Sequence, residues 1–149
     1  MSSVRNSAKA IIIEDGHILV VKYAATDGFV YCLPGGGQQN GEPLTNALKR
    51  ECLEEISSAV DVGELLFIRE YIGHHYDRPG YHQVELMFHC TLQDGYECIN
   101  GHETDIGQIG VEWLPIDRLD QYRLYPKAII PLLMNEQYYH EPVYLGDVE

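Results

Sequence analysis

The chain has 149 residues, with 10 Lys or Arg and 23 Asp or Glu, so its formal net charge is −13. This length suits one domain, and a hydrophobic share of 45% is typical of a globular protein rather than a disordered one. The negative charge disfavours nucleic acid and anionic membranes as partners, because both are polyanions. We therefore predict a single domain over residues 1–149.

The cysteines and the N-terminal segment both favour a cytoplasmic protein. The four cysteines are widely spaced and form no C-x-x-C pair, which favours free thiols in a reducing compartment. The apolar run Ala10–Ile13 is far shorter than the roughly 20 residues of a membrane span, and it does not resemble a signal peptide.

The first part of the chain predicts three strands. The apolar runs Ala10–Ile13 and Ile18–Tyr23 are separated by Asp15 and Gly16, a pairing typical of a hairpin turn. Phe29–Leu33 is the third strand candidate. A loop that opens with Gly35, Gly36 and Gly37 is expected to follow it.

A helix is predicted next, from Pro43 to the serines at 57 and 58, because apolar residues recur there at spacings of three and four. The remaining elements are expected as strands over Leu65–Ile72, Gln83–Leu92, Val111–Leu114 and Val143–Leu145, a helical turn at Pro115–Asp117, and a helix over Pro126–Leu133. This mixture predicts an α+β or mixed α/β fold.

The predicted helix carries its acids in an unusual place. On a helical wheel of about 100° per residue, Glu51 and Glu55 fall inside the apolar stripe rather than opposite it. Burying carboxylates is costly unless a cation neutralises them. Arg50 can pair with Glu54, four residues on, but cannot serve all the acids. The sequence therefore favours a hard divalent cation, Mg²⁺, Mn²⁺ or Ca²⁺, beside this helix.

The three glycines before the helix support a ligand site. Gly35, Gly36 and Gly37 allow the backbone to approach a bound group closely, and glycine loops that precede helices often hold phosphates. Glu42 adds a further acid between these glycines and the helix. We therefore expect the three glycines to contact substrate.

The spacing of these residues resembles the Nudix box of the MutT-like hydrolases. The matching positions are Gly36, Glu42, Arg50, Glu51, Cys52 in the apolar slot, Glu54 and Glu55. Two positions at the end of the box differ, because Ser57 replaces a glycine and Ser58 replaces an apolar residue.

The resemblance implies a Nudix-type α/β/α sandwich around a mixed sheet, and an enzyme that hydrolyses the diphosphate of a nucleoside diphosphate linked to another group. It also implies that Glu51, Glu54 and Glu55 hold Mg²⁺ (or Mn²⁺), with a backbone carbonyl near Gly36. In that arrangement Arg50 orients the glutamates. The catalytic set is then Arg50, Glu51, Glu54 and Glu55, joined by a general base.

The general base and the substrate contacts stay open. The base is a box glutamate or an acid of the polar loop before Val111, where Glu103 is favoured over Glu97. Aromatic side chains can stack on a base. Tyr76 is our candidate substrate contact, and Tyr23, Phe29, Tyr31 and Tyr81 are alternatives.

The expected substrate is a small nucleotide-like diphosphate, ADP-ribose or a nucleotide sugar. The alternatives are a hydrolase that removes unwanted nucleoside triphosphates or one that cleaves dinucleoside polyphosphates. A non-catalytic nucleotide-sensing module is a further class, but it generally lacks the box acids that this chain keeps. The abundant tyrosines are also compatible with a homodimer interface.

Overall fold

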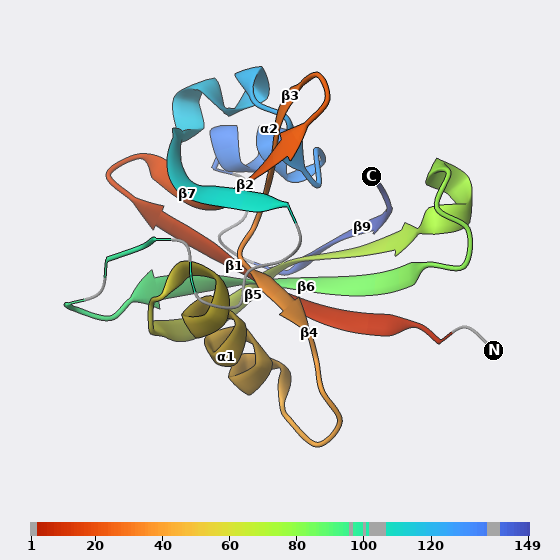
Figure 1. Cartoon of the computed structure of the whole chain (residues 1–149), viewed down its shortest axis with the longest axis horizontal. Helices are drawn as coiled ribbons and strands as arrows, with labels where there is room; N and C mark the ends of the chain where they lie inside the picture. Colours follow the sequence, from red (N-terminus) through yellow and green to blue (C-terminus); the bar gives the residue numbers. More distant parts are fainter. Residues whose placement is uncertain (1–2, 96, 100, 102–106, 137–140) are drawn as a thin grey trace.

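In the part of the chain that the structure describes, a curled, mixed sheet of nine strands forms the centre of the molecule (Figure 1). The strands are β1 (Arg5–Glu14), β2 (His17–Ala25), β3 (Gly28–Cys32), β4 (Gly35–Gly37), β5 (Val60–Ile72), β6 (His82–Leu92), β7 (Gln108–Pro115), β8 (Leu124–Tyr125) and β9 (Val143–Asp147). The structure, a computed structural model, describes all residues except 1–2, 96, 100, 102–106 and 137–140.

The β1–β2 hairpin joins two halves of this sheet. In one half, β4, β1, β6, β5 and β9 lie in that order, and in the other β2 lies between β7 and β3, with β8 beside β3. β1 and β2 pair at Ile13–Ile18 and at Glu14–His17, next to the turn. Asp15 (φ 50°) and Gly16 (φ 72°) are both left-handed, as a type I′ hairpin turn requires. The predicted hairpin is confirmed.

Helices cover both sides of the sheet. Helix α1 (Leu44–Ile56) lies below it in Figure 1, whereas helix α2 (Ile129–Met134) and the 3₁₀ turn Ile116–Gln121 lie above. Each side has its own apolar cluster. Beneath α1 the cluster includes Leu48, Cys52 and Ile56 packed with Ala8, Ala10 and Ile12, and the other includes Ile11, Phe67, Met87, Ile129 and Leu133. This arrangement confirms the predicted fold class.

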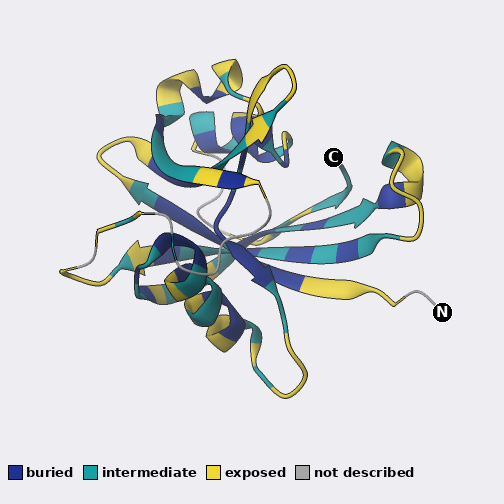
Figure 2. Cartoon of the chain, in the orientation of Figure 1, coloured by how far each residue is buried: buried dark blue, intermediate teal, exposed yellow. Residues whose placement is uncertain are grey.

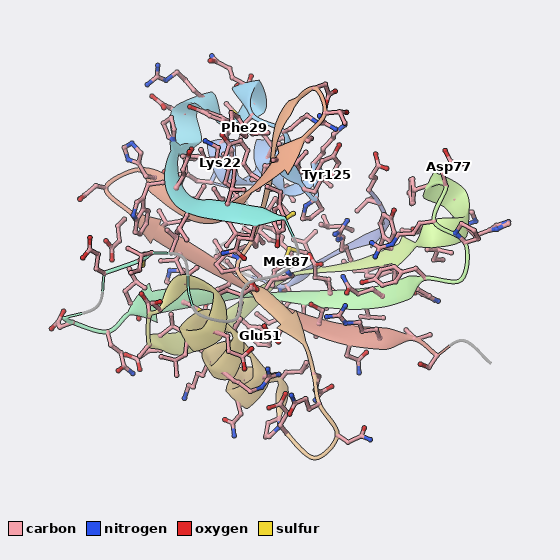
Figure 3. The ribbon with its side chains drawn as sticks, viewed as in Figure 1. Lys22, Phe29, Glu51, Asp77, Met87 and Tyr125 are labelled. Carbon is pink, nitrogen blue, oxygen red and sulfur yellow. The ribbon has the colours of Figure 1, made fainter. Side chains whose placement is uncertain are left out.

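The alternation of buried and partly exposed residues along the strands separates the two sides. It is visible as bands on β6 in Figure 2. On β1, Ala8 and Ala10 pack in the cluster beneath α1. Ser7, Lys9 and Ile11 then face the other side, because successive residues of a strand point to opposite faces. In Figure 3, Met87 and Glu51 mark the sides above and below the sheet.

Two strands were not predicted, and several ends differ. The expected glycine loop is strand β4, which pairs with β1 from Lys9–Gly35 to Ser7–Gly37. Three glycines have no side chains, so they give no apolar alternation from which a strand can be read. The two-residue strand β8 is too short for any pattern, β7 begins three residues earlier than expected, and α2 starts at Ile129 rather than at Pro126.

All four cysteines are free, as predicted: Cys32, Cys52, Cys90 and Cys98. In the part of the chain that the structure describes, none of the helices has the length and apolar character needed to cross a bilayer.

Candidate active site

Helix α1 turns two of its carboxylates towards the sheet, as the helical wheel predicts. Glu55 is 1% exposed and lies on the buried face of α1 with Leu48 and Cys52, while Glu51 and Glu54 are partly exposed. Burial raises the pKa of Glu51 above its usual value, and the nearby Arg50 guanidinium opposes this shift. The helix therefore holds carboxylates where water solvates them poorly, and a bound cation would stabilise their charge.

Gly36 brings the backbone of β4 against Glu51. A Cβ added at Gly36 would lie 2.5 Å from the Glu51 Cδ and 2.7 Å from each carboxylate oxygen. Only glycine can therefore stand here while the carboxylate keeps its place. The neighbouring Gly35 has φ 136°, and its added Cβ would lie 2.1 Å from the Ala8 carbonyl oxygen. The glycines thus bring β1, β4 and the α1 carboxylates close together.

Arg50 links the acids around this strand. Its Nη2 donates to the Glu42 Oε1 at 2.8 Å and to the Gly37 carbonyl oxygen at 3.1 Å. Its Nη1 donates to Glu51 at 3.0 Å and to Glu54 at 3.3 Å. Because Arg50 holds Glu42 so closely, it keeps the pKa of that carboxyl below its usual value. The guanidinium orients acids from both ends of the box.

Lys9 is a neighbour of the site that the sequence analysis missed. Its Nζ donates to the Gly35 carbonyl oxygen at 3.3 Å and to the Leu33 carbonyl oxygen at 3.4 Å. The sequence did place Lys9 between the apolar residues Ala8 and Ala10. In a strand, this position directs the lysine side chain to the opposite face of the sheet. Finding its partner required knowing that β4 pairs with β1.

The donor set fits a hard divalent cation. Carboxylate oxygens and a backbone carbonyl suit Mg²⁺ or Mn²⁺, and here Glu51 touches the Gly36 backbone while Glu54 and Glu55 lie one helical turn away. Among the residues that the structure describes, no group of three His, Cys, Asp or Glu side chains is already arranged around one point. Arg50 donates to Glu51 and Glu54, so the same guanidinium would orient two of the residues that would hold the metal.

Other predicted site residues are not gathered here. The structure holds Tyr76 in the 3₁₀ turn Gly73–Tyr76, where its ring stacks on Tyr71 (centroids 5.1 Å apart) and its hydroxyl donates to the Asp147 carbonyl oxygen. This turn lies at the tip of the β5–β6 hairpin, away from α1 (Figure 1). Glu103 lies outside the described residues, and Glu97 is exposed.

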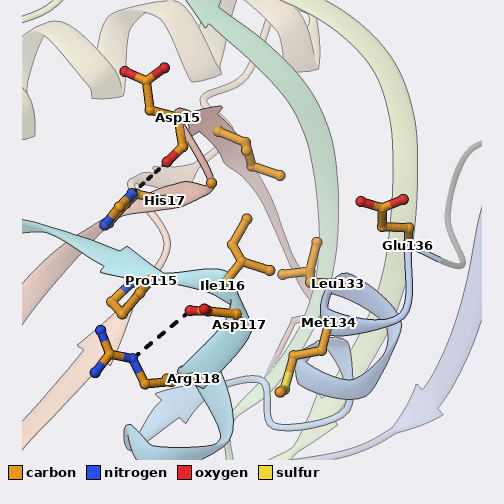
Figure 4. Close-up of a pocket in the computed structure, with 11 residues that line it drawn as sticks. Asp15, His17, Pro115, Ile116, Asp117, Arg118, Leu133, Met134 and Glu136 are labelled. Atoms are coloured by element: carbon orange, nitrogen blue, oxygen red, sulfur yellow. Dashed lines mark hydrogen bonds and ion pairs between the residues drawn. The ribbon is translucent and has the colours of Figure 1, made fainter.

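A pocket of about 590 Å³ lies at the opposite end of β1, between the β1–β2 hairpin, the Ile116 turn and helix α2 (Figure 4). Ile13, Ile116 and Leu133 form apolar parts of its wall, and Asp15 and Asp117 are among its acids. It contains none of the box residues, so the carboxylates and glycines, rather than this hollow, define the candidate active site.

The fold thus sets a carboxylate-bearing helix beside a strand of glycines. A family model described as the NUDIX domain matches residues 4–133, and the chain belongs to this family. The predicted family is thereby confirmed, and it indicates a hydrolase acting on pyrophosphate bonds. A comparison with curated proteins finds no match.

Solved structures of the family share the fold. An ADP-ribose pyrophosphatase from Streptococcus suis is 18% identical, with a TM-score of 0.65 over 94% of this chain and 98% of that one. The E. coli ORF135 protein is 25% identical, with a TM-score of 0.64 over 91% and 90%. A UDP-X diphosphatase is 21% identical, with a TM-score of 0.70 over 96% of this chain and 68% of the other.

Proposed function

We propose that the protein is a Mg²⁺-dependent pyrophosphohydrolase that cleaves the diphosphate of a nucleoside diphosphate linked to another group. ADP-ribose or a nucleotide sugar is the proposed substrate. The observation that carries the proposal is the contact of the half-buried Glu51 with Gly36, one turn from the buried Glu55, in a chain of the NUDIX family. The similarity to an ADP-ribose pyrophosphatase and to a UDP-X diphosphatase supports this substrate class.

The proposed chemistry divides among the box residues. Glu51, Glu54 and Glu55 would hold the metal with the Gly36 carbonyl, and a bound divalent metal lowers the pKa of a water and offsets phosphoryl charge. Arg50 keeps the carboxylates oriented through the hydrogen bonds described above. The backbone of β4 lets the diphosphate lie close to these acids. Glu103 stays our predicted general base.

A substrate panel tests the proposal. Purified protein is incubated with Mg²⁺ and, separately, with a chelator, on ADP-ribose, ADP-glucose, UDP-glucose, diadenosine polyphosphates and nucleoside triphosphates. We expect metal-dependent release of a nucleoside monophosphate from ADP-ribose or a nucleotide sugar. Faster turnover of triphosphates would instead assign the alternative hydrolase. Tight nucleotide binding without turnover of any substrate would contradict the proposal and assign a sensor.

A further inference from the structure

A row of polar residues crosses the sheet on the face opposite α1. Strand register aligns Gly37 of β4 with Ser7 of β1, Ser7 with Glu85 of β6, and Glu85 with Arg69 of β5. Ser7, Glu85 and Arg69 are buried, although this face continues into the apolar cluster of Phe67 and Met87. Buried polar groups on an otherwise apolar face are costly and call for a physical reason.

Some of the polar groups in this row form hydrogen bonds within the protein. The Arg69 Nη2 donates to the Glu85 Oε2 at 3.4 Å, its Nη1 donates to the Val148 carbonyl oxygen at 3.0 Å, and the Gln83 Nε2 donates to the Glu85 Oε2 at 2.9 Å. Glu85 therefore offsets the charge of Arg69. The pair is electrically neutral, so it favours an uncharged ligand over a phosphate.

Two atoms of the row have no partner. Among the described residues, neither the Ser7 Oγ nor the Arg69 Nε has a hydrogen-bond partner, although Ser7 is only 1% exposed and Arg69 8%. An unsatisfied buried group costs free energy, which a ligand atom bound there would recover. The Arg69 N–H can only donate, so that ligand atom is a hydrogen-bond acceptor.

The row begins at the candidate active site. Gly37 follows Gly36, which touches Glu51, and Arg69 lies three strand spacings of about 4.8 Å further along the sheet. Lys9 and Arg5, which flank Ser7 on the same face, are partly exposed and exposed, so the first strand of the row borders solvent. The distance from Gly37 to Arg69 therefore suits the group attached to the diphosphate rather than the diphosphate itself.

We propose that Ser7 and Arg69, with Glu85 holding Arg69 in place, bind an uncharged oxygen of the group linked to the diphosphate and so determine specificity. This proposal rests on the proposed function and adds the part of the substrate that is recognised. The oxygen belongs to the base or to the terminal sugar, and both sources offer the same acceptor chemistry.

Ser7→Ala is the sharpest test, because it removes no hydrogen bond among the described residues. KM and kcat are measured over two series, ADP-, GDP- and UDP-glucose for the base and ADP-ribose against ADP-glucose for the sugar. We expect KM of the preferred substrate to rise about fivefold, the effect of one lost hydrogen bond, with kcat within about twofold. Loss of preference within the base series or the sugar series identifies which part carries the oxygen.

Arg69→Lys keeps the charge beside Glu85 but removes the Nε–H, so it should shift KM in the same direction. Ser58→Ala is the matched control. The Ser58 hydroxyl is buried on the α1 side and donates to the Ile56 carbonyl oxygen at 3.1 Å, so its loss should lower stability and leave KM unchanged. If Arg69→Lys does not fold, Ser7→Ala decides alone.

Calorimetric titration of a non-hydrolysable ADP-ribose, with a methylene group in place of the bridging oxygen of the diphosphate, into Mg²⁺-loaded wild type and Ser7→Ala measures the same contact without turnover. A weaker affinity of the variant supports the contact between Ser7 and the ligand. If the wild type binds the ligand but hydrolyses no substrate, only the proposed function fails. Unchanged KM and affinity in Ser7→Ala would overturn the proposal. An equal rise of KM for every substrate would also overturn it, since it would place Ser7 on the shared diphosphate.

Discussion

The guanidinium of Arg50 joins carboxylates that are far from equivalent. It holds Glu42 through both oxygens and touches Glu51 and Glu54 through a single nitrogen. Burial raises the pKa of Glu51, whereas Arg50 lowers that of Glu42. Glu42 is thus held as a structural partner of Arg50. Burial destabilises the charged form of Glu51, and a bound cation would stabilise it.

Replacing Arg50 by Lys should damage catalysis more than stability. An ammonium cannot span Glu42, Glu51 and the Gly37 carbonyl at once, because it lacks the planar fork of a guanidinium. We expect kcat to fall by about 10- to 100-fold, with a stability loss of about 1–2 kcal/mol. Steady-state kinetics and urea denaturation measure both effects.

The control is Arg118→Lys, at an exposed arginine 3.9 Å from the exposed Asp117. Exposed ion pairs contribute little, so this variant should behave as the wild type. Equal kinetics for Arg50→Lys and Arg118→Lys would show that Arg50 does not orient the glutamates.

Some of the site could be predicted from residues alone. The helical period placed Glu51 and Glu55 among apolar residues, and the glycines marked a close approach. Lys9, Ser7 and Arg69 could not be found in this way, because their significance depends on which strands are neighbours. Strand order and register are set by contacts far apart in the sequence, and no local pattern records them.

At the scale of elements, the end of helix α1 carries a departure from the family pattern. Ser57 caps the helix in the left-handed conformation, with φ 56° and ψ 31°, where the Nudix box has glycine. The departure therefore leaves the backbone shape intact and places a side chain in a strained region.

Ser57→Gly should stabilise the protein by about 1 kcal/mol, since relief of left-handed strain exceeds the added flexibility of the unfolded chain. Urea denaturation at neutral pH measures the change. Ser58→Gly is the comparison, and it should destabilise because it removes a buried hydroxyl that donates to the Ile56 carbonyl oxygen. A loss of stability in Ser57→Gly would show that Ser57 is not strained.

The terminal strand β9 is held to β5 by carboxylates whose pKa values are lowered. His75 and the Ile72 N–H lower the pKa of Asp147 below its ordinary 3.8, and Tyr144 and His82 lower that of Glu70 below 4.5. A carboxyl with a lowered folded pKa stabilises the fold above its ordinary pKa, and this contribution is lost as pH falls through the lower value.

We therefore expect β9 to stay protected from hydrogen exchange at about pH 5.5 and to lose protection below about pH 4. Asp147→Asn should reduce the protection of β9 already at about pH 5.5, because the amide cannot form the ion pair with His75. Asp120→Asn, at an exposed residue of the Ile116–Gln121 turn, is the control. Identical protection of β9 in both variants would contradict this account.

The strands that carry runs of apolar residues were predicted, and those without such runs were missed. β1 and β2 carry apolar runs joined by a turn, and β6 is rich in apolar residues, and all three strands are present. β4 consists of glycines and β8 has two residues, so their strand character comes wholly from pairing with β1 and β3.

At the scale of the whole molecule, the two apolar clusters share their strands. β1 contributes Ala10 to the α1 side and Ile11 to the α2 side, and β2 contributes Leu19 and Val20 in the same way. Neither side can lose these strands without the other, so we propose that residues 1–149 form one domain.

This proposal predicts a single cooperative unfolding transition by calorimetry. The calorimetric and van't Hoff enthalpies should agree, and fluorescence of Trp113 should change together with circular dichroism. Two resolved transitions would indicate two independently stable units. Sedimentation of the same sample measures its oligomeric state.

Part of the net charge of −13 lies at the candidate active site. Four glutamates account for part of it: Arg50 joins Glu42, Glu51 and Glu54 beside β4, and Glu55 lies on the same helix. With a divalent metal bound, this region can attract phosphates that the bare charge of the molecule repels. Metal dependence is therefore the property on which the whole account rests.

The most direct test compares Glu51→Gln with Glu64→Gln, at an exposed glutamate of β5, in an ADP-ribose hydrolysis assay titrated with Mg²⁺. Glu51→Gln should lose at least about 100-fold in kcat while keeping its fold, because one of the proposed metal-binding carboxylates is gone. Glu64→Gln should match the wild type. Full Mg²⁺-dependent activity in Glu51→Gln would contradict the assignment of the metal to this helix.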